Sequence, residues 1–201
     1  MKYKRYLGLV LVAMLPLAGC ATTYIKPSTV HNPAPAERLS AFGSFELQRV
    51  ALSDSYSDHE ANLKAAAKIQ EYFDTDITPI VAGWNRKAPQ SPSVRTIVIE
   101  PRIEHIKFIG GAARFWAGPL AGSSAVLMKI KYTDKASGKL IAEPEFLQRA
   151  ASWSGAVTVG GQDNAMLSRI VTLVADYTKR NYDAAVGGPS GAPQELVNAT
   201  R

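Results

Sequence analysis

The sequence predicts a two-layer α+β domain in which a small, mostly antiparallel sheet is packed by two helices, in the order β-α-β-β-β-α. Two stretches, near residues 57–73 and 163–183, repeat apolar side chains at helical spacing. A third, residues 124–146, alternates apolar and polar side chains on both sides of a turn, which is typical of a β-hairpin. Because an apolar helix stripe and an apolar sheet face each need a cover, these patterns predict two packed layers.

The first strand is predicted at 45–52, and the first helix follows it. Ser57 and Glu60 fit a capping box with Ser57 at the N-cap. The helix then has one predicted core face, made of Leu63, Ala66, Ala67, Gln70 and Phe73 and widened by Ile69 and Tyr72. Residues 74–79 are expected to break or kink this helix, and 78–85 to add one more turn.

The next strand, within 94–110, changes parity along its length. Ile97, Ile99 and Ile103 share one parity, whereas Ile106 shares the other with Phe108. Because a strand has a period of two, the switch predicts a bulge or break near residues 101–105. Pro101 within this run predicts an edge position, because proline cannot donate to a β-ladder.

The hairpin at 124–146 has a predicted register. Pairing Tyr132 with Leu140 places Lys129 opposite Glu143, which favours that register. Gly138 supplies a positive φ in the turn. The second strand is expected to continue towards Trp153, with an irregularity at Pro144.

The last helix is predicted to begin at Asp163 as its N-cap and to end near Lys179 and Arg180, where cations favour the helix dipole. The side chains expected to face the sheet are Met166, Ile170, Val171, Val174 and Tyr177. Trp84 and Trp153 are also expected in the core.

The first 19 residues are typical of a secretory signal peptide. Lys2, Lys4 and Arg5 precede an apolar run of about eleven residues, about half of what a spanning helix needs. Leu17 to Cys20 resembles the lipobox of bacterial lipoproteins, and Cys20 is the only cysteine. That resemblance implies cleavage between Gly19 and Cys20, acyl chains on Cys20 and, from Ala21 in place of Asp, sorting to the outer membrane with the domain in the periplasm. The alternative is an ordinary signal peptide followed by a lone thiol.

The chain divides into four predicted parts: signal peptide 1–19, lipidated Cys20 with a flexible tether through 41, a single domain at 42–183, and a disordered tail at 184–201. A tether of about twenty residues would span about 25 Å. Loss of three cations with the signal peptide lowers the formal net charge from +6 to +3. That weak charge and a periplasmic location argue against a nucleic-acid partner.

The motifs of the folded part resemble those of a family of Gram-negative lipoproteins known only as a domain of unknown function (4410-type). The shared features are a D-x-x-S-G-K turn and a Gly-Gly pair before the last helix, over about residues 42–183. Here these positions are Asp134, Ser137, Gly138, Lys139, Gly160 and Gly161. The resemblance implies a location and an architecture, and it implies no reaction.

Catalytic residues, a metal site and a cofactor are not predicted. His31, His59 and His105 are spaced for no shared metal, and capping explains Asp54, Asp58 and Glu60. The sequence contains neither a G-x-S-x-G elbow nor a G-x-x-x-x-G-K-[ST] loop. We therefore expect a protein that is not an enzyme.

Large apolar residues interrupt the Gly-rich connection between two predicted strands. Phe115, Trp116 and Leu120 lie there beside Arg114. They either fold back onto the core or form a surface that contacts a partner protein or the membrane. The leading hypothesis is a membrane-anchored lipoprotein that binds or helps assemble an envelope protein or polymer. The alternatives are an envelope hydrolase and a glycan- or small-ligand-binding lipoprotein.

Overall fold

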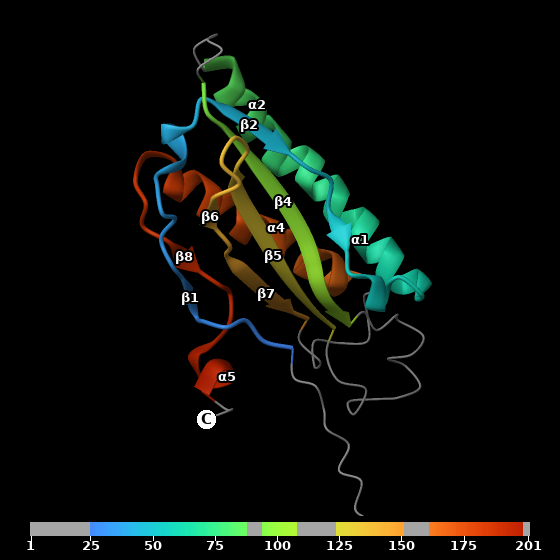
Figure 1. Ribbon diagram of the computed structural model, residues 1–201. Coiled ribbons are helices and arrows are strands. Elements are labelled where there is room, and N and C mark those ends of the chain that lie inside the picture. Colours follow the sequence, from blue (N-terminus) through green and yellow to red (C-terminus); the bar gives the residue numbers. More distant parts are fainter. Residues whose placement is uncertain (1–24, 88–93, 108–123, 151–160, 199–201) are drawn as a thin grey trace, which may run out of the picture.

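The computed structural model describes residues 25–87, 94–107, 124–150 and 161–198, and these form a two-layer α+β structure (Figure 1). Helices α1, α2 and α4 cover one face of the main sheet. The strands are β1 (His31–Asn32), β2 (Ser44–Leu47), β3 (Ala51–Leu52), β4 (Thr96–Lys107), β5 (Ala125–Asp134), β6 (Leu140–Ala142), β7 (Glu145–Arg149) and β8 (Gly188–Pro189). The helices are α1 (Glu60–Tyr72), α2 (Thr78–Lys87), α4 (Gly161–Asp183) and α5 (Gln194–Asn198), with short helices η1 (Leu39–Ala41), η2 (Asp54–Tyr56) and η3 (Phe73–Ile77). The predicted fold class is confirmed.

The main sheet is mixed and, within the described residues, has the order β2-β4-β5-β6, with β3 also beside β4 and β7 beside β5. β2 and β3 run parallel to β4, whereas the β4–β5, β5–β6 and β5–β7 pairs are antiparallel. A parallel pair needs a crossover connection, and α1 with α2 supplies it. The antiparallel pairs follow the predicted hairpin order.

The predicted bulge in β4 is confirmed, because the register with β5 shifts between Ile103 and His105. The edge position predicted from Pro101 is wrong, since β4 has neighbours on both sides. The carbonyls of Ile99 and Ile103 accept hydrogen bonds from the backbone N–H groups of Gln48 and Ser53, on the edge of β4 that faces β2 and β3. Pro101 has the same parity, so its nitrogen also points towards that edge. It lies where β2 has ended and β3 has not begun. The missing N–H is therefore tolerated inside the sheet.

The hairpin forms with a different register from the predicted one. Tyr132 pairs with Ala142, and Leu140 pairs with Thr133 across an irregularity. Lys129 lies opposite Glu145. The bulge beside the turn shifts the second strand by two positions, which the alternating pattern alone does not reveal. Gly138 has the predicted positive φ, at 69°, and the strand is interrupted between β6 and β7, at Pro144.

The first helix begins later than predicted, and its buried face is shifted: Ile69 and Phe73 are buried as predicted, but Leu63 is not. α1 begins at Glu60 with His59 as N-cap and no side-chain cap, so the capping box at Ser57 is wrong. The residues of α1 that are buried are Asn62, Ala65 and Ile69, whereas Leu63 is 49% exposed. Asn62 can be buried because its amide donates to the Tyr56 carbonyl at 3.2 Å.

The predicted break in the first helix is a π-helical turn. The Thr78 N–H bonds to the Phe73 carbonyl, five residues earlier, and the chain continues as α2 through ten residues. Pro79 follows that bond directly, where its missing N–H leaves a gap in the α-helical pattern.

The apolar face predicted for the last helix is confirmed. Met166, Ile170, Val171, Val174 and Tyr177 are all buried against the sheet and α1. The helix begins at Gly161, two residues before the predicted cap, and ends at Asp183.

A buried pair of hydroxyls joins this helix to the sheet. Tyr132 and Thr178 lie 2.7 Å apart, and Thr178 also bonds to the Val174 carbonyl. Burial raises the pKa of the Tyr132 phenol well above its usual value, although the Thr178 hydrogen bond opposes this effect.

Both terminal segments are more ordered than the sequence predicts. β1 pairs with β8, so parts of the predicted tether and the predicted tail form a second, two-stranded sheet. Ala192 and Leu196 pack on Leu127 and Leu147, on the sheet face opposite the helices. The predictions of a flexible tether through 41 and a disordered tail from 184 are therefore wrong over the described parts of these segments.

Glycine lets the tail approach the strands closely. Gly191 has φ 81°, and a Cβ there would lie 2.5 Å from the Leu147 carbonyl oxygen. Gly187 has φ 74°, and a Cβ there would lie 2.3 Å from the Asn32 carbonyl oxygen. The C-terminal segment has a Gly- and Pro-rich composition that usually favours disorder, but here its glycines allow two backbone segments to pack closely.

Side-chain amides cap the outer strands of the main sheet. Asn85 of α2 accepts from the Phe45 N–H at 2.8 Å and donates to the Phe45 carbonyl at 2.9 Å. Asn32 makes the same two bonds with Glu145 of β7, both at 2.8 Å. Each amide takes the place of a neighbouring strand.

Candidate functional site

The predicted lipidation and contact residues lie outside the described part of the chain. Gly19 and Cys20 precede it, and Arg114, Phe115, Trp116 and Leu120 fall between β4 and β5. Trp153 also lies outside. These assignments stay predictions.

The histidines and the N-terminal acidic residues are separated or engaged in local contacts. His105 Nδ1 lies 2.7 Å from the Tyr56 hydroxyl, and the two rings meet edge to face. Glu60 forms an ion pair with Lys64 at 2.7 Å. Over residues 25–87, 94–107, 124–150 and 161–198, no three His, Cys, Asp or Glu side chains lie close enough to hold a metal ion.

Trp84 packs as predicted, in an aromatic cluster at the margin of the core. Its ring stacks on Tyr182 with centroids 4.2 Å apart and contacts Phe45 at 5.0 Å. The cluster joins α2, α4 and β2. Tyr182 therefore occupies one face of the indole, which a stacked sugar ring would otherwise need.

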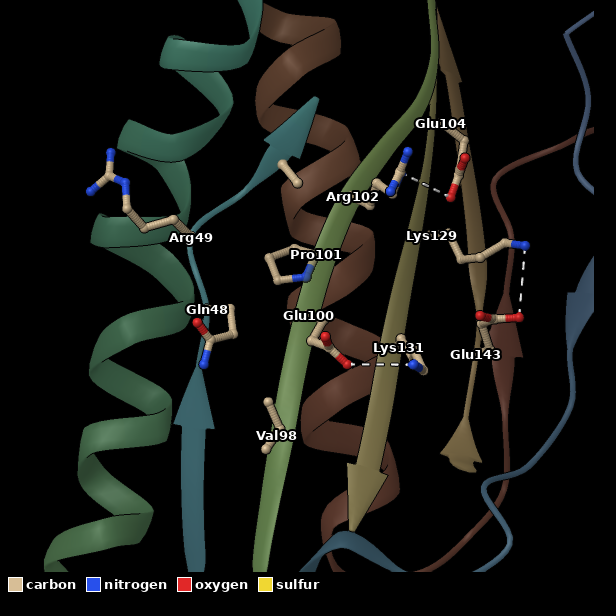
Figure 2. A pocket seen from close by; sticks show the side chains of 11 residues that line it. Gln48, Arg49, Val98, Glu100, Pro101, Arg102, Glu104, Lys129, Lys131 and Glu143 are labelled. Atoms are coloured by element: carbon tan, nitrogen blue, oxygen red, sulfur yellow. Dashed lines mark ion pairs between the residues drawn. The ribbon is translucent and has the colours of Figure 1, made fainter. Parts of the chain in front are cut away.

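The face of the sheet opposite the helices, here called the outer face, carries a depression of about 500 Å³. Figure 2 shows its side chains projecting from β4 and β5 and from the segment between β2 and β3. The lining residues are Gln48, Arg49, Ala51, Val98, Glu100, Pro101, Arg102, Glu104, Lys129, Lys131 and Glu143. Cations and carboxylates alternate across it.

Ion pairs organise the outer face. Lys131 lies 3.8 Å from Glu100, on the neighbouring strand, and both side chains are about half exposed. Lys129 lies between two carboxylates, 3.7 Å from Glu143 and 3.5 Å from Glu145. Burial opposes the charge of Lys129, but these carboxylates outweigh it and raise the pKa of its ammonium.

These ion pairs are looser than hydrogen-bonded ones. Their separations, together with 3.6 Å between Arg102 and Glu104, exceed the 2.7–2.9 Å that is usual for a tight charge-assisted hydrogen bond. A partner could therefore bind these groups without first breaking strong bonds.

The strand period explains why the charges gather here. Val98, Glu100 and Arg102 have the parity opposite to Ile97, Ile99 and Ile103, so they point away from the helices. The hairpin pattern predicts a contact between Lys129 and Glu143, and the ion pair forms although Lys129 lies opposite Glu145. The charged surface around this pair was not predicted. The available signal was charge of both signs at alternate positions on two consecutive strands.

A second polar cluster fastens the N-terminal segment to the hairpin turn. Arg95 donates to Asp134 Oδ2 at 2.7 Å and to Glu37 Oε2 at 2.7 Å, and its guanidinium lies 4.3 Å from the centre of the Phe42 ring. Lys139 adds an ion pair to Glu37 at 3.3 Å.

Asp134 also closes the hairpin turn, because its Oδ1 accepts from the backbone N–H groups of Ala136 and Ser137. The hydrogen bonds from Arg95 outweigh burial and hold the pKa of the Asp134 and Glu37 carboxyls below their usual values. The family-like D-x-x-S-G-K turn thus has a structural role in this chain.

Among the helices that the structure describes, none combines the length and the apolar composition needed to cross a bilayer.

Comparison with known proteins gives weak structural similarity. No protein-family model and no curated protein matches the chain. A PelC dodecamer structure from Paraburkholderia phytofirmans is similar at 14% identity and a TM-score of 0.37, covering 72% of this chain and 95% of that one. The hypothetical protein CT253 of Chlamydia trachomatis is similar at 11% identity and a TM-score of 0.38, over 70% and 99%. A "putative lipoprotein" of Caulobacter crescentus CB15 is similar at 14% identity and a TM-score of 0.31, over 73% and 90%.

Proposed function

We propose that this chain is a lipid-anchored lipoprotein of the outer membrane whose periplasmic domain binds a partner protein through the outer face and acts by binding, not by catalysis. The lipobox-like Leu17–Cys20 segment and the position of the only cysteine support the anchor. The outer face supports the binding role.

One observation carries the binding role: over the described residues, the charged depression is open, whereas other parts of the sheet are covered. The helices cover the inner face of the sheet. On the outer face, Ala192 and Leu196 cover the apolar residues Leu127 and Leu147. The amide caps occupy the outer strands. Among the residues that the structure describes, no segment covers the charged depression, whose lining side chains are drawn in Figure 2.

The charges favour a protein as the partner. Arg49, Arg102, Lys129 and Lys131 are interspersed with three glutamates in one depression. A polyanion would meet those carboxylates, and a polycation would meet the lysines and arginines. A protein surface with charges of both signs can complement the whole pattern.

Labelling in cells tests the anchor. The wild-type protein should incorporate palmitate, and globomycin, which blocks lipoprotein signal peptidase, should cause its precursor to accumulate. A Cys20→Ser variant should show neither effect. A mature protein that is released without detergent and carries no acyl mass would contradict the anchor.

Site-specific cross-linking tests the binding surface. A photo-reactive amino acid at Gln48, on the outer face, should give a discrete cross-linked product in cells. The matched control is the same amino acid at Asp176, which is exposed on α4. Loss of that product in Lys131→Glu, and its recovery in the charge-swapped Glu100→Lys, Lys131→Glu double variant, would identify the charge pattern as the determinant. Equal products from both positions would contradict the proposal.

A further inference from the structure

The first described residue is held at one end of the main sheet. Arg149, the last residue of β7, donates from Nη2 to the Ile25 carbonyl at 2.6 Å. In the sheet register, Arg149 lies opposite Ala125, and Ala125 lies opposite Lys107. Ile25 therefore lies at the end of the sheet where β4 and β7 stop and β5 begins, here called the base (Figure 1).

The chain between the base and Cys20 is short. Only five residue steps separate Cys20 from Ile25, so the two Cα atoms lie at most about 17 Å apart even in a fully extended chain. The tether of about twenty residues expected from composition is not available, because much of it is fixed to the domain. Asn32 bonds to Glu145, and Ala36 donates to the Ile141 carbonyl.

The opposite end of the sheet is far from this attachment. β5 runs for ten residues from the base to the turn that contains Gly138. At about 3.3 Å per residue, this strand separates the two ends by about 30 Å. The distance along β5 thus exceeds the reach of the tether.

We propose that the domain stands end-on at the bilayer, with the base facing the lipid headgroups and the 135–139 turn pointing away from them. The partner of the base is a phospholipid surface. In this orientation the main strands run along the membrane normal, and the outer face stands upright, open to a partner that approaches along the membrane. This inference rests on the lipid anchor of the proposed function.

The single cysteine makes a direct test practical. Once Cys20 is acylated, one introduced cysteine is the only free thiol. Lys107→Cys places a donor fluorophore at the base, and Ala136→Cys places it in the turn; both positions are exposed. The full-length lipidated protein is reconstituted into vesicles of phosphatidylethanolamine and phosphatidylglycerol that carry a headgroup-linked acceptor.

Energy transfer should be several-fold stronger from position 107 than from position 136. Equal transfer, or stronger transfer from position 136, in protein that floats with the vesicles would overturn the orientation. Protein that does not float with the vesicles would instead overturn the anchor, so the two failures are distinguishable.

A longer tether provides the matched control. A Gly/Ser insertion of about fifteen residues after Ala21 adds about 20 Å of root-mean-square reach. It should reduce the difference in transfer between the two positions while vesicle flotation is unchanged. A difference that persists in full would overturn the argument that the short chain fixes the orientation.

Discussion

The two faces of the main sheet are built from the same strands and have opposite chemistry. On the face under the helices, Ile97, Ile103 and Ile130 are completely buried. On the outer face, their neighbours Arg102 and Lys131 are exposed and charged. The inner face forms the core of the fold, and the outer face carries charged side chains that point away from it. A residue's parity, more than its position along the strand, thus decides whether it lies in the core or on the charged outer face.

The outer face itself divides into two parts along β5. Leu127 is covered by the C-terminal segment, whereas Lys129 and Lys131, two and four residues further on, line the open depression. Among the described residues, the apolar part of this face is therefore covered and the charged part is exposed. This division indicates that the terminal segments belong to the folded domain.

The largest expected effect separates the two faces directly. Ile103→Ala, on the inner face, should lower the free energy of unfolding by about 2–5 kcal/mol, because it removes buried methylene groups and leaves a cavity. Val98→Ala is the matched change on the outer face of the same strand and should cost less than about 1 kcal/mol. Urea denaturation of both variants measures the difference. Equal losses would contradict the assignment of the two faces.

The next effect tests whether the C-terminal segment belongs to the domain. Gly191→Ala should destabilise the protein by about 2 kcal/mol, because it combines a strained positive φ with a Cβ too close to the Leu147 carbonyl. Gly138→Ala has a similar φ but open space around it and should cost about 1 kcal/mol. Hydrogen exchange should show faster exchange of the Leu147 amide, which donates to Ser190, only in the Gly191 variant.

A smaller effect depends on pH and involves the Arg95 cluster. The pKa values of Asp134 and Glu37 are lower in the folded protein than in an unfolded chain, so their stabilising contribution is complete above the ordinary carboxyl pKa of about 4. It is lost as the pH falls through the lowered values. Arg95→Met should therefore lower Tm at pH 7, and the difference in Tm from the wild type should narrow as the pH falls below about 4.

The control for that pH dependence is Lys64→Met, which removes a fully exposed pair with Glu60 and should change Tm much less at pH 7. A gap between Arg95→Met and the wild type that stays constant down to pH 3 would mean that Arg95 acts through its contact with Phe42 alone.

The smallest expected effect on stability sharpens the role of the outer face. Glu100→Ala and Lys131→Ala should each change the free energy of unfolding by less than about 1 kcal/mol, because both side chains are about half exposed. The same variants should weaken the cross-link formed from Gln48. A loss of several kcal/mol would instead show that this ion pair supports the fold.

The sequence predicts the inner face and its irregularity well, because parity is a local signal. The change from Ile103 to Ile106 locates the bulge, and the spacing from Met166 to Tyr177 gives the buried helix face. The predicted face of α1 was right at Ile69 and wrong at Leu63, because Asn62, which is buried, looks like a surface residue until its bond to the Tyr56 carbonyl is known. Apolar periodicity does not show that a polar side chain has a buried hydrogen-bond partner.

The outer face and the terminal segments were missed for a different reason. Charged residues that point away from a core are expected in solvent, so the sequence predicts no binding role for Glu100 and Lys131. The glycines at 187 and 191 favoured disorder by composition, although each is needed where the backbone comes close to another strand. Both errors concern tertiary contacts between segments distant in sequence.

With the lipid anchor proposed above, the amides of Asn32 and Asn85 have a consequence for the crowded surface of a membrane. Lipid anchoring confines copies of a protein to two dimensions, where encounters between exposed strand edges become frequent. These two side chains occupy the backbone groups of Glu145 and Phe45 that an incoming strand would need. Neighbouring copies would therefore pass one another without joining sheets, whereas alanine at either position would expose these backbone groups.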